Sequence, residues 1–374
     1  STRPTICPSG ILLSCSIVLT ALNSRCGIVG SLSNYLNDLV SRSRWEDEVA
    51  FFKRQLSRFN SSINDQRQEQ SIKADLEYRF ILCRHWNIHD SMLHSRYIAS
   101  KLQLWRDRGW RRLTELFAAM GVPLEACRRD WIIMEKQHRE HFDTRLSIYS
   151  KRFGLDEVVF PSFLIEDSTC GGMAAGDHAF ALFAILENPY NDLAASRSEA
   201  LRANFSVALR ALQIQKGAAE VKEGIRLAIH QHQVLFGLLQ HIFTHRILRY
   251  GKRFRYAVLR GASGTNDKAW ITHPQTLSRL ALFVKDATGQ GHSKKAHLPL
   301  LLASWQPDNL SFLVVAVAGS HSTQAQGVKP FNMAYRAAAE KSRARIRHDS
   351  FEATVIEVAD DDLKPFIQSL QKEL

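Results

Sequence analysis

The stretch of this chain best suited to chemistry is a basic and aromatic run, His245 to Tyr256, in which arginine and lysine alternate with tyrosine and phenylalanine. Bases stack on aromatic rings while basic side chains follow phosphates, and proteins bind single strands without sequence preference in this way. We therefore expect a nucleic-acid contact from four residues: Arg249, Lys252, Arg253 and Arg255. The alternative is a solvated turn whose aromatic side chains point into the core.

The pattern of histidines and aspartates in the chain does not indicate a catalytic site. His241 and His245 are four residues apart, a spacing that puts two imidazoles on one helix face, but no cysteine or paired acid stands near them. Asp177 precedes His178 at the start of an apolar segment, and a first-turn acid that complements the helix dipole explains it. We predict no catalytic residue, no metal site and no cofactor.

One glycine-rich segment, Gly289-Gln290-Gly291-His292, has the residue types of a phosphate-binding loop. Backbone N–H groups in such a loop can cradle a phosphate. Here the segment follows a predicted helix and leads into a predicted strand, so we interpret it as a flexible connection.

The composition is that of an ordinary globular protein, with 374 residues, 45% of them hydrophobic and 23% charged. That length allows two or three domains. The net charge of +12 favours contact with polyanions or acidic protein surfaces. The six cysteines are irregularly spaced without a CxxC pair, which favours reduced thiols over a disulfide framework or a zinc site.

The segment around which the chain is organised runs from Glu77 to Pro123 and has large apolar residues three or four apart, which predicts short helices. Breaks are expected at Asp90-Ser91 and at Gly109, and Gly121 fits a helix C-cap. We expect a compact, independent packing unit with Trp86 and Trp105 in or near its core. A helical unit so rich in large side chains is either a core or an interaction surface.

The rest of the chain predicts a mixed α/β protein. A long, charged helical stretch is expected from Pro123 to Phe153. An edge strand or extended connection is expected over 158–165, because Pro161 cannot donate to a central ladder. An apolar helix is expected over 175–186 and long helices over 196–249. Strands and helices alternate from Arg255 to the end, which is typical of an α/β domain.

The N-terminal residues are harder to interpret. Ile11 to Leu22 is an apolar run too short to span a bilayer, and it is read either as a signal peptide or as a buried strand or helix. Trp45 to Phe59 has the pattern of an amphipathic helix, and Asn60 to Gln70 is polar and reads as a linker.

Several of these segments, in fixed order, resemble the cell division cycle protein 45 family. The resemblance covers about 27–374 and is carried by Arg79-Phe80, Arg84-His85-Trp86, His89-Asp90-Ser91-Met92, Lys101-Leu102-Gln103-Leu104-Trp105, Met120-Gly121-Val122-Pro123-Leu124, Lys329-Pro330-Phe331, His348-Asp349-Ser350-Phe351 and Val355-Ile356-Glu357-Val358.

The resemblance implies an α/β fold related to RecJ-type DHH phosphoesterases. It places an atypical N-terminus with a remnant of a DHH-like domain at 1–72, a helical interdomain at 73–165 and a DHHA1-like domain at 166–374. No Asp-His-His triplet is present, and a metal-dependent phosphoesterase needs such a cluster to activate water.

The family further implies a nuclear, non-catalytic scaffold of the replicative helicase. Its expected partners are the minichromosome maintenance ring, the GINS complex, the DNA polymerase machinery and single-stranded DNA, with no membrane. Trp86, Trp105, Arg106 and Arg108 are candidate partner contacts. Two other functions stay open at this point: an active RecJ-type exonuclease and a stand-alone nucleic-acid-binding module.

Overall fold

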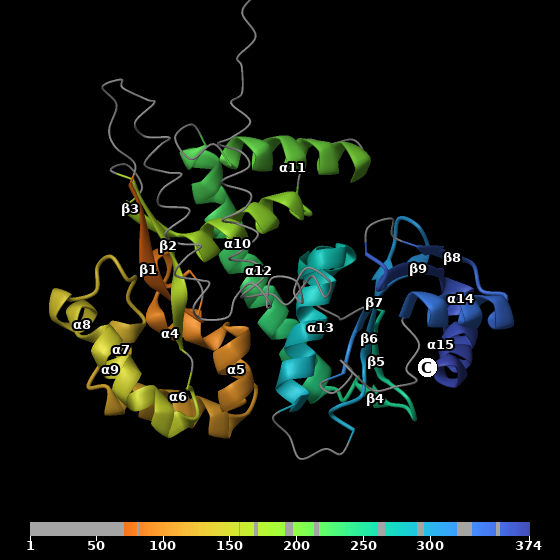
Figure 1. Ribbon diagram of the computed structural model, residues 1–374, viewed down its shortest axis with the longest axis horizontal. Helices are drawn as coiled ribbons and strands as arrows, with labels where there is room; N and C mark the ends of the chain where they lie inside the picture. Colours follow the sequence, from red (N-terminus) through yellow and green to blue (C-terminus); the bar gives the residue numbers. More distant parts are fainter. Residues whose placement is uncertain are drawn as a thin grey trace, which may run out of the picture.

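The computed structural model describes the chain from residue 71 to its end, with short internal gaps. The gaps are 81, 157, 168–170, 191–196, 213–216, 261–265, 290–294, 320–330 and 349–351. The predictions for 1–70, four of the six cysteines and most of the Gly289–His292 loop therefore lie outside the described residues. The described part contains two sheets joined by long helices (Figure 1).

The first sheet has three antiparallel strands in the order β1-β2-β3. They are β1 (Ser71–Tyr78), β2 (Val159–Asp167) and β3 (Gly171–Ala174). The edge-strand prediction for 158–165 is wrong, because β2 pairs with β1 on one side and with β3 on the other. Pro161 is tolerated in this central strand opposite Leu76.

The connection from β1 to β2 is the helical unit that the sequence predicts. Its helices are α4 (Ile88–Leu93), α5 (Arg96–Leu102), α6 (Asp107–Ala119), α7 (Leu124–Cys127), α8 (Lys136–Glu140) and α9 (Phe142–Tyr149), with 3₁₀ turns η1 (Cys83–His85) and η2 (Ser150–Phe153). The helical stretch predicted from Pro123 to Phe153 thus consists of three short helices, α7, α8 and α9, and the turn η2. The predicted limits of this unit at 73 and 165 fall inside β1 and β2.

The helix boundaries in this unit follow from their caps. The Asn87 side chain accepts from the Asp90 backbone N–H, so α4 starts before Asp90 and the predicted break at Asp90-Ser91 is wrong. Gly109 lies inside α6 rather than in a break, and a Cβ there would come 2.2 Å from the carbonyl oxygen of Gln103. Gly121 has φ +66 just after α6, which confirms the predicted C-cap.

Three helices follow the first sheet: α10 (Ala175–Leu186), α11 (Arg197–Ala211) and α12 (Ala218–Thr244). The bounds predicted for α10 are confirmed. Gly224 lets α12 approach α10 closely, because a Cβ at this position would lie 2.8 Å from the carbonyl oxygen of Ala181 in α10. With 27 residues, α12 runs from the first sheet to the second (Figure 1).

The second sheet has six strands in the order β4-β5-β6-β7-β9-β8. They are β4 (Arg249–Tyr250), β5 (Arg255–Leu259), β6 (Leu300–Gln306), β7 (Ser311–Val317), β8 (Ile346–His348) and β9 (Val355–Ala359). Only β5 and β6 are parallel among the paired strands described. The crossover between them contains η3 (Asn266–Thr272) and α13 (Pro274–Gly289).

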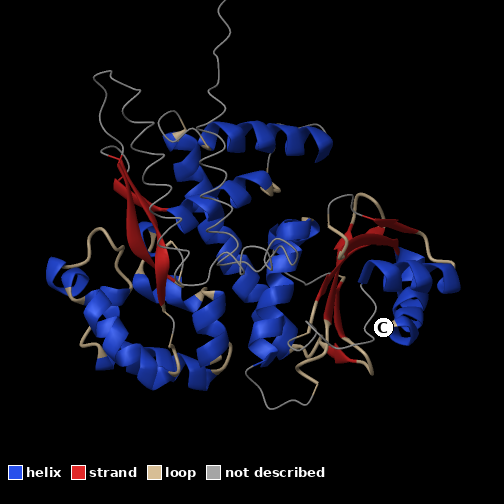
Figure 2. Ribbon diagram, viewed as in Figure 1, coloured by secondary structure: helices blue, strands red, loops and turns tan. Residues whose placement is uncertain are grey.

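Helices cover both faces of this sheet (Figure 2). On one face α13 packs with Leu300 and Leu302. On the other face lie α14 (Phe331–Ser342) and α15 (Leu363–Glu373). A short 3₁₀ turn, η4 (Asp360–Asp362), precedes α15. Tyr335 of α14 and Phe366 of α15 pack against Leu301 of the sheet. The prediction of a mixed α/β fold is confirmed.

The larger core is continuous across the predicted domain limits. One cluster of buried apolar side chains runs from Phe80 through α10, α12 and α13 to Val355. The helical unit therefore does not have a core of its own, and the expectation that it packs independently is wrong. An ion pair between Arg96 of α5 and Asp286 of α13, 3.1 Å apart, spans the same junction. None of the described helices combines the length and the apolar character needed to cross a membrane.

Candidate nucleic-acid interface

The basic and aromatic run forms a β-hairpin at the edge of the second sheet. Arg249 pairs with Tyr256 and Tyr250 with Arg255, while the Gly251 N–H donates to the Phe254 carbonyl at 3.0 Å and closes the turn. The hairpin follows directly on α12. Only two residues of β4 pair, and the loop ends at Phe254, whose side chain is buried in the core.

The end of the hairpin is exposed and basic. Arg249, Lys252 and Arg253 are exposed, and the ring of Tyr250 is 45% exposed beside them. A half-exposed tyrosine next to three cations provides the two elements of a sequence-neutral single-strand site: a stacking face and phosphate contacts. The structure thus brings together three of the four residues that the sequence predicts.

The C-terminal helix holds this loop in place. Oε1 of Gln371 in α15 accepts from the backbone N–H of Lys252 at 3.1 Å and of Arg253 at 3.3 Å. Arg253 also donates from Nη1 to the carbonyl oxygen of Leu374 at 3.0 Å. A groove of about 720 Å³ separates hairpin and helix, lined by Leu248, Arg249, Tyr250, Gly251, Lys252, Tyr256, Ile367, Gln368 and Gln371.

Arg255 is not part of this surface. Its side chain is fully buried, with Nη2 donating to the Leu298 carbonyl at 2.9 Å and Nη1 to the Thr288 hydroxyl at 2.5 Å. Burial lowers the pKa of its guanidinium. The prediction of a phosphate contact at Arg255 is wrong, because alternation along β5 turns this side chain toward α13 while its neighbours face elsewhere.

Lys295 is a cation at the hairpin that the sequence analysis missed. Its Nζ lies 3.3 Å from the Gly251 carbonyl oxygen, and the residue is exposed. Gln371 was missed as well. Both residues are far from the hairpin in sequence, and neither belongs to a motif, so only the fold brings them there.

The four candidate partner contacts have different surroundings. Trp86 is buried and its ring stacks on His94 at 5.0 Å, so it is a core residue and the prediction that it contacts a partner is wrong. Trp105 is half-buried and stacks on Phe243 of α12 at 5.0 Å. Arg106 and Arg108 are exposed at the start of α6, and their role stays a prediction.

The metal-binding alternatives gain no support from the geometry. His241 and His245 lie with ring centroids 4.2 Å apart, and His245 Nδ1 is 3.1 Å from the His241 carbonyl oxygen. Asp177 sits in the first turn of α10 and accepts from the Leu82 N–H at 2.8 Å. Among the residues that the structure describes, no group of three or more metal-ligating side chains occurs.

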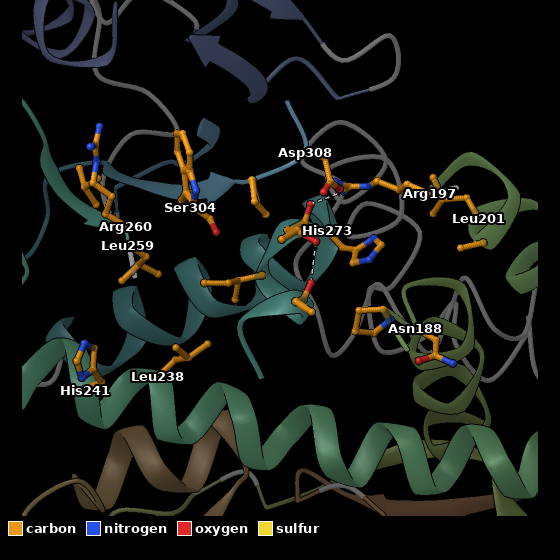
Figure 3. Close-up of a pocket in the computed structure, with 18 of the residues that line it drawn as sticks. Asn188, Arg197, Leu201, Leu238, His241, Leu259, Arg260, His273, Ser304 and Asp308 are labelled. Atoms are coloured by element: carbon orange, nitrogen blue, oxygen red, sulfur yellow. Dashed lines mark hydrogen bonds and ion pairs between the residues drawn. The ribbon is translucent and has the colours of Figure 1, made fainter. Parts of the chain in front are cut away.

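A second cavity, of about 640 Å³, lies between α11, α12 and the ends of β5 and β6 (Figure 3). Arg197 reaches across from α11, donating to Gln306 Oε1 at 2.9 Å and to the Thr272 carbonyl at 2.8 Å. His273 is buried in its wall, where desolvation and the charge of Arg197 lower its pKa to about 4. The imidazole is therefore neutral at pH 7.

Together these observations define a mixed α/β protein with a helical insertion between two strands of its first sheet. Comparison with known proteins gives the family. The model of the CDC45 family matches residues 26–373, and the chain belongs to that family.

Curated relatives agree with this assignment. The chain is 30% identical over 295 residues to the cell division control protein 45 homolog of Dictyostelium discoideum, covering 79% of this chain and 45% of the relative. It is 25% identical over 353 residues to the human homolog, covering 92% and 60%. The chain spans about half the length of the curated relatives it matches.

The fold has a counterpart among solved structures. The crystal structure of CDC45 from Entamoeba histolytica superimposes with a TM-score of 0.61 at 22% sequence identity. The match covers 83% of this chain and 60% of that one.

Proposed function

We propose that this chain acts in DNA replication as a non-catalytic scaffold subunit of the eukaryotic replicative helicase, in the nucleus. In this proposal it bridges the minichromosome maintenance ring and the GINS complex, works beside the DNA polymerase machinery and contacts single-stranded DNA. The observation that carries the proposal is the family match over 26–373. The relatives are named as cell division control proteins, which fits a replication role.

Co-purification tests the scaffold role. Affinity-tagged chain should capture subunits of the minichromosome maintenance ring and of GINS from a nuclear extract treated with nuclease. Arg106 and Arg108 are exposed and flank the start of α6, so Arg106→Glu with Arg108→Glu should reduce capture. The matched control is Arg128→Glu with Arg129→Glu, two exposed arginines after α7. Absence of both complexes from the parent eluate would overturn the scaffold role.

The hairpin carries the proposed contact with single-stranded DNA. Arg249, Lys252 and Arg253 present charge beside Tyr250, and each phosphate contact on a single strand lowers the slope of log affinity against log salt by about 0.7. Changing Lys252 and Arg253 together to alanine should flatten that slope by roughly 1.4. The loss should be nearly equal for different base sequences, because backbone contacts carry little sequence information.

Titration of fluorescein-labelled oligonucleotides at several salt concentrations measures these slopes. The charge-matched control is Arg128→Ala with Arg129→Ala, which removes two exposed cations far from the hairpin. Its slope should equal the parent slope. Equal slopes for the parent and the hairpin variant would remove the hairpin from the DNA contact and leave the scaffold role to be judged by co-purification.

A further inference from the structure

The cavity of Figure 3 lies at the carboxyl ends of β5 and β6, the parallel pair described in the second sheet. Its volume of about 640 Å³ falls within the range of roughly 300–1,000 Å³ that pockets for small ligands have. Leu259 and Ser304, which pair near these strand ends, both line it. Open α/β sheets commonly bind ligands in a crevice at the carboxyl ends of parallel strands. The cavity therefore has the position and the size of a small-molecule site.

Two buried polar side chains in the cavity wall lack a protein partner. His273 is 6% exposed and Ser304 is 1% exposed. Among the residues that the structure describes, none hydrogen-bonds to the imidazole of His273 or to the hydroxyl of Ser304. Buried polar groups in native proteins nearly always have a hydrogen-bond partner, because an unpaired group costs free energy. These two groups are therefore available to a molecule that enters the cavity.

The part of that molecule next to His273 has to be uncharged. The cation beside the imidazole, Arg197, donates to Gln306 Oε1 at 2.9 Å and to the Thr272 carbonyl at 2.8 Å. Its Nη1 also lies 3.8 Å from Asp308 Oδ2. The imidazole itself is neutral at pH 7, because burial and the charge of Arg197 lower its pKa to about 4. A buried anionic group would thus find no uncommitted counter-charge there, and burying an unpaired charge is costly.

Other parts of the wall are apolar. Leu238 of α12, Leu259 of β5 and Ile271 of η3 line the cavity, and each of them is buried. A ring that lies on aliphatic side chains gains free energy from the removal of apolar surface from water. An uncharged ring with apolar faces and hydrogen-bonding groups on its edge matches both kinds of wall. Nucleobases have this combination, and proteins bind unstacked bases through edge hydrogen bonds and contacts on the ring faces.

Arg260 places a cation at the rim of the cavity. It follows Leu259 at the end of β5 and lies away from Arg197 in the close-up (Figure 3). Its Nη2 pairs with Asp360, and its guanidinium carbon lies 5.7 Å from the ring centroid of Trp305. The side chain is nevertheless 63% exposed, so the other donors of the guanidinium stay accessible to a ligand. A guanidinium held in this way suits a phosphate group, which accepts from several donors at once.

We propose that this cavity binds a mononucleotide, with its base at His273 and Ser304 and its phosphate at Arg260. The nucleotide is either a free molecule or one unit of a single strand, since both present the same base and phosphate. The cavity shares no lining residue with the groove beside the hairpin. The site is therefore separate from the proposed contact of the hairpin with DNA.

The polar lining argues against two other ligands. A wholly apolar molecule would leave the imidazole of His273 and the hydroxyl of Ser304 unpaired. A small dicarboxylate would bring a second charge to the buried end, where Arg197 is already bound by protein oxygens. Water can also fill a polar cavity of this size. Binding experiments decide between water and a nucleotide.

Isothermal titration calorimetry with the full chain tests the proposal. The probes are the four ribonucleoside monophosphates, their nucleosides and inorganic phosphate, each titrated to about 1 mM so that weak binding is still detected. We expect at least one monophosphate to bind about tenfold more tightly than its nucleoside, because charge-assisted hydrogen bonds to Arg260 are added. No binding of any monophosphate would overturn the proposal. Inorganic phosphate that binds as tightly as the monophosphates would overturn it as well.

Ser304→Ala separates ligand binding from stability. It removes a buried hydroxyl without a protein partner, so the urea midpoint should not fall, whereas the affinity for the nucleotide should drop by about fivefold. Ser100→Ala is the matched control, because Ser100 is 2% exposed and its hydroxyl also lacks a partner among the described residues, but it lies in α5 and does not line the cavity. An unchanged affinity in Ser304→Ala, or an equal loss in Ser100→Ala, would contradict the site.

Arg260→Gln tests the position of the phosphate. The variant should lose the preference for the monophosphate over the nucleoside and keep the affinity for the nucleoside. Arg345→Gln is the charge-matched control, since Arg345 pairs with Asp362 and is 73% exposed. It should retain the preference of the parent. A preference that survives Arg260→Gln would overturn the assignment of the phosphate to this residue.

Competition distinguishes the two sources of the nucleotide. The variant with both Lys252→Ala and Arg253→Ala has a weakened hairpin and should bind the mononucleotide as the parent does. In this variant, a homo-oligonucleotide of the preferred base that displaces the mononucleotide would assign the cavity to a unit of a single strand. Absence of displacement would assign it to the free nucleotide. Loss of mononucleotide binding in the hairpin variant would overturn the separation of the two sites.

Discussion

Arg255 and Lys252 are three residues apart in one basic run, yet they have opposite environments. The alternation along β5 places Arg255 under α13, where backbone and hydroxyl oxygens surround its guanidinium, whereas Lys252 lies in the turn. Residue type alone predicts a phosphate contact for both. Strand register decides between them, and that register depends on pairing with β6, about forty residues away.

Arg255→Ala should therefore lower stability rather than DNA affinity. The change leaves the Leu298 carbonyl without its donors in the interior and opens a cavity, so the free energy of unfolding should fall by about 2–4 kcal/mol. Urea unfolding followed by circular dichroism measures it. Arg249→Ala, at an exposed position of the same hairpin, should change stability by less than about 0.5 kcal/mol.

His273 gives the protein a dependence on pH that can be isolated. Its pKa falls from 6.5 to about 4 on folding, because it is buried beside Arg197. The unfolded state then binds the proton more tightly than the folded state. The free energy of unfolding therefore keeps its full value above pH 6.5 and decreases as the pH falls from 6.5 toward 4. The loss should reach about 3 kcal/mol at most.

The thermal midpoint measured from pH 7 to pH 4 tests this dependence. In His273→Gln it should fall less steeply on acidification than in the parent, because the variant has no proton to take up at this position. His245→Gln removes an exposed histidine and should follow the parent curve. Parallel curves for the parent and His273→Gln would contradict the assignment.

At the scale of elements, the hydrophobic period and the capping residues predicted most helices. They did not predict which tertiary contacts interrupt a helix or pair a strand. α10 is predicted to the residue, because Asn188-Pro189 stops an apolar helix. The segment after Pro123 has a helical period throughout. Trp131 is nevertheless not helical, and its N–H donates to the Trp86 carbonyl at 2.8 Å. Pro161 suggested an edge strand, and only the pairing with β1 and β3 shows otherwise. Such tertiary contacts have no local signal.

Trp105 joins two elements that are distant in sequence. Its ring stacks on Phe243 of α12 at 5.0 Å with an interplanar angle of 19°. A double-mutant cycle with Trp105→Ala and Phe243→Ala should therefore give a coupling energy of about 0.5–1.5 kcal/mol. Chemical denaturation of the four proteins measures it. Strict additivity would show that the two rings act independently, and a cycle with Tyr250→Ala in place of Phe243→Ala should be additive.

At the scale of the whole molecule, the sequence predicted the α/β class and the positive charge, but not the shared core. The pattern of the helical unit is that of a compact bundle, and nothing local says that α5 will pack on α13 or that one cluster will continue from Phe80 to Val355. Of the proposed DNA contact, the hairpin cations were predictable from their types and proximity, whereas Lys295 and Gln371, which lie beside them, were not.

The proposed scaffold role predicts that the purified chain lacks nuclease activity. Incubation with single-stranded DNA and Mn²⁺ or Mg²⁺ should release no more nucleotide than a mock purification. EDTA should leave the thermal midpoint unchanged, because no described group of ligands ties a metal to the fold. Metal-dependent cleavage above the mock level would favour the exonuclease alternative instead.

The position of β9 has a consequence for synthesis of the protein. β9 lies between β7 and β8 in the sheet, although it follows both of them in the sequence, and α15 follows it in covering one face. Until Val355–Ala359 leaves the ribosome, β8 lacks its neighbour and β7 exposes an unpaired edge. The six-stranded sheet therefore cannot complete itself before Val355–Ala359 is made, and a nascent chain stopped near residue 350 should be held by chaperones rather than folded.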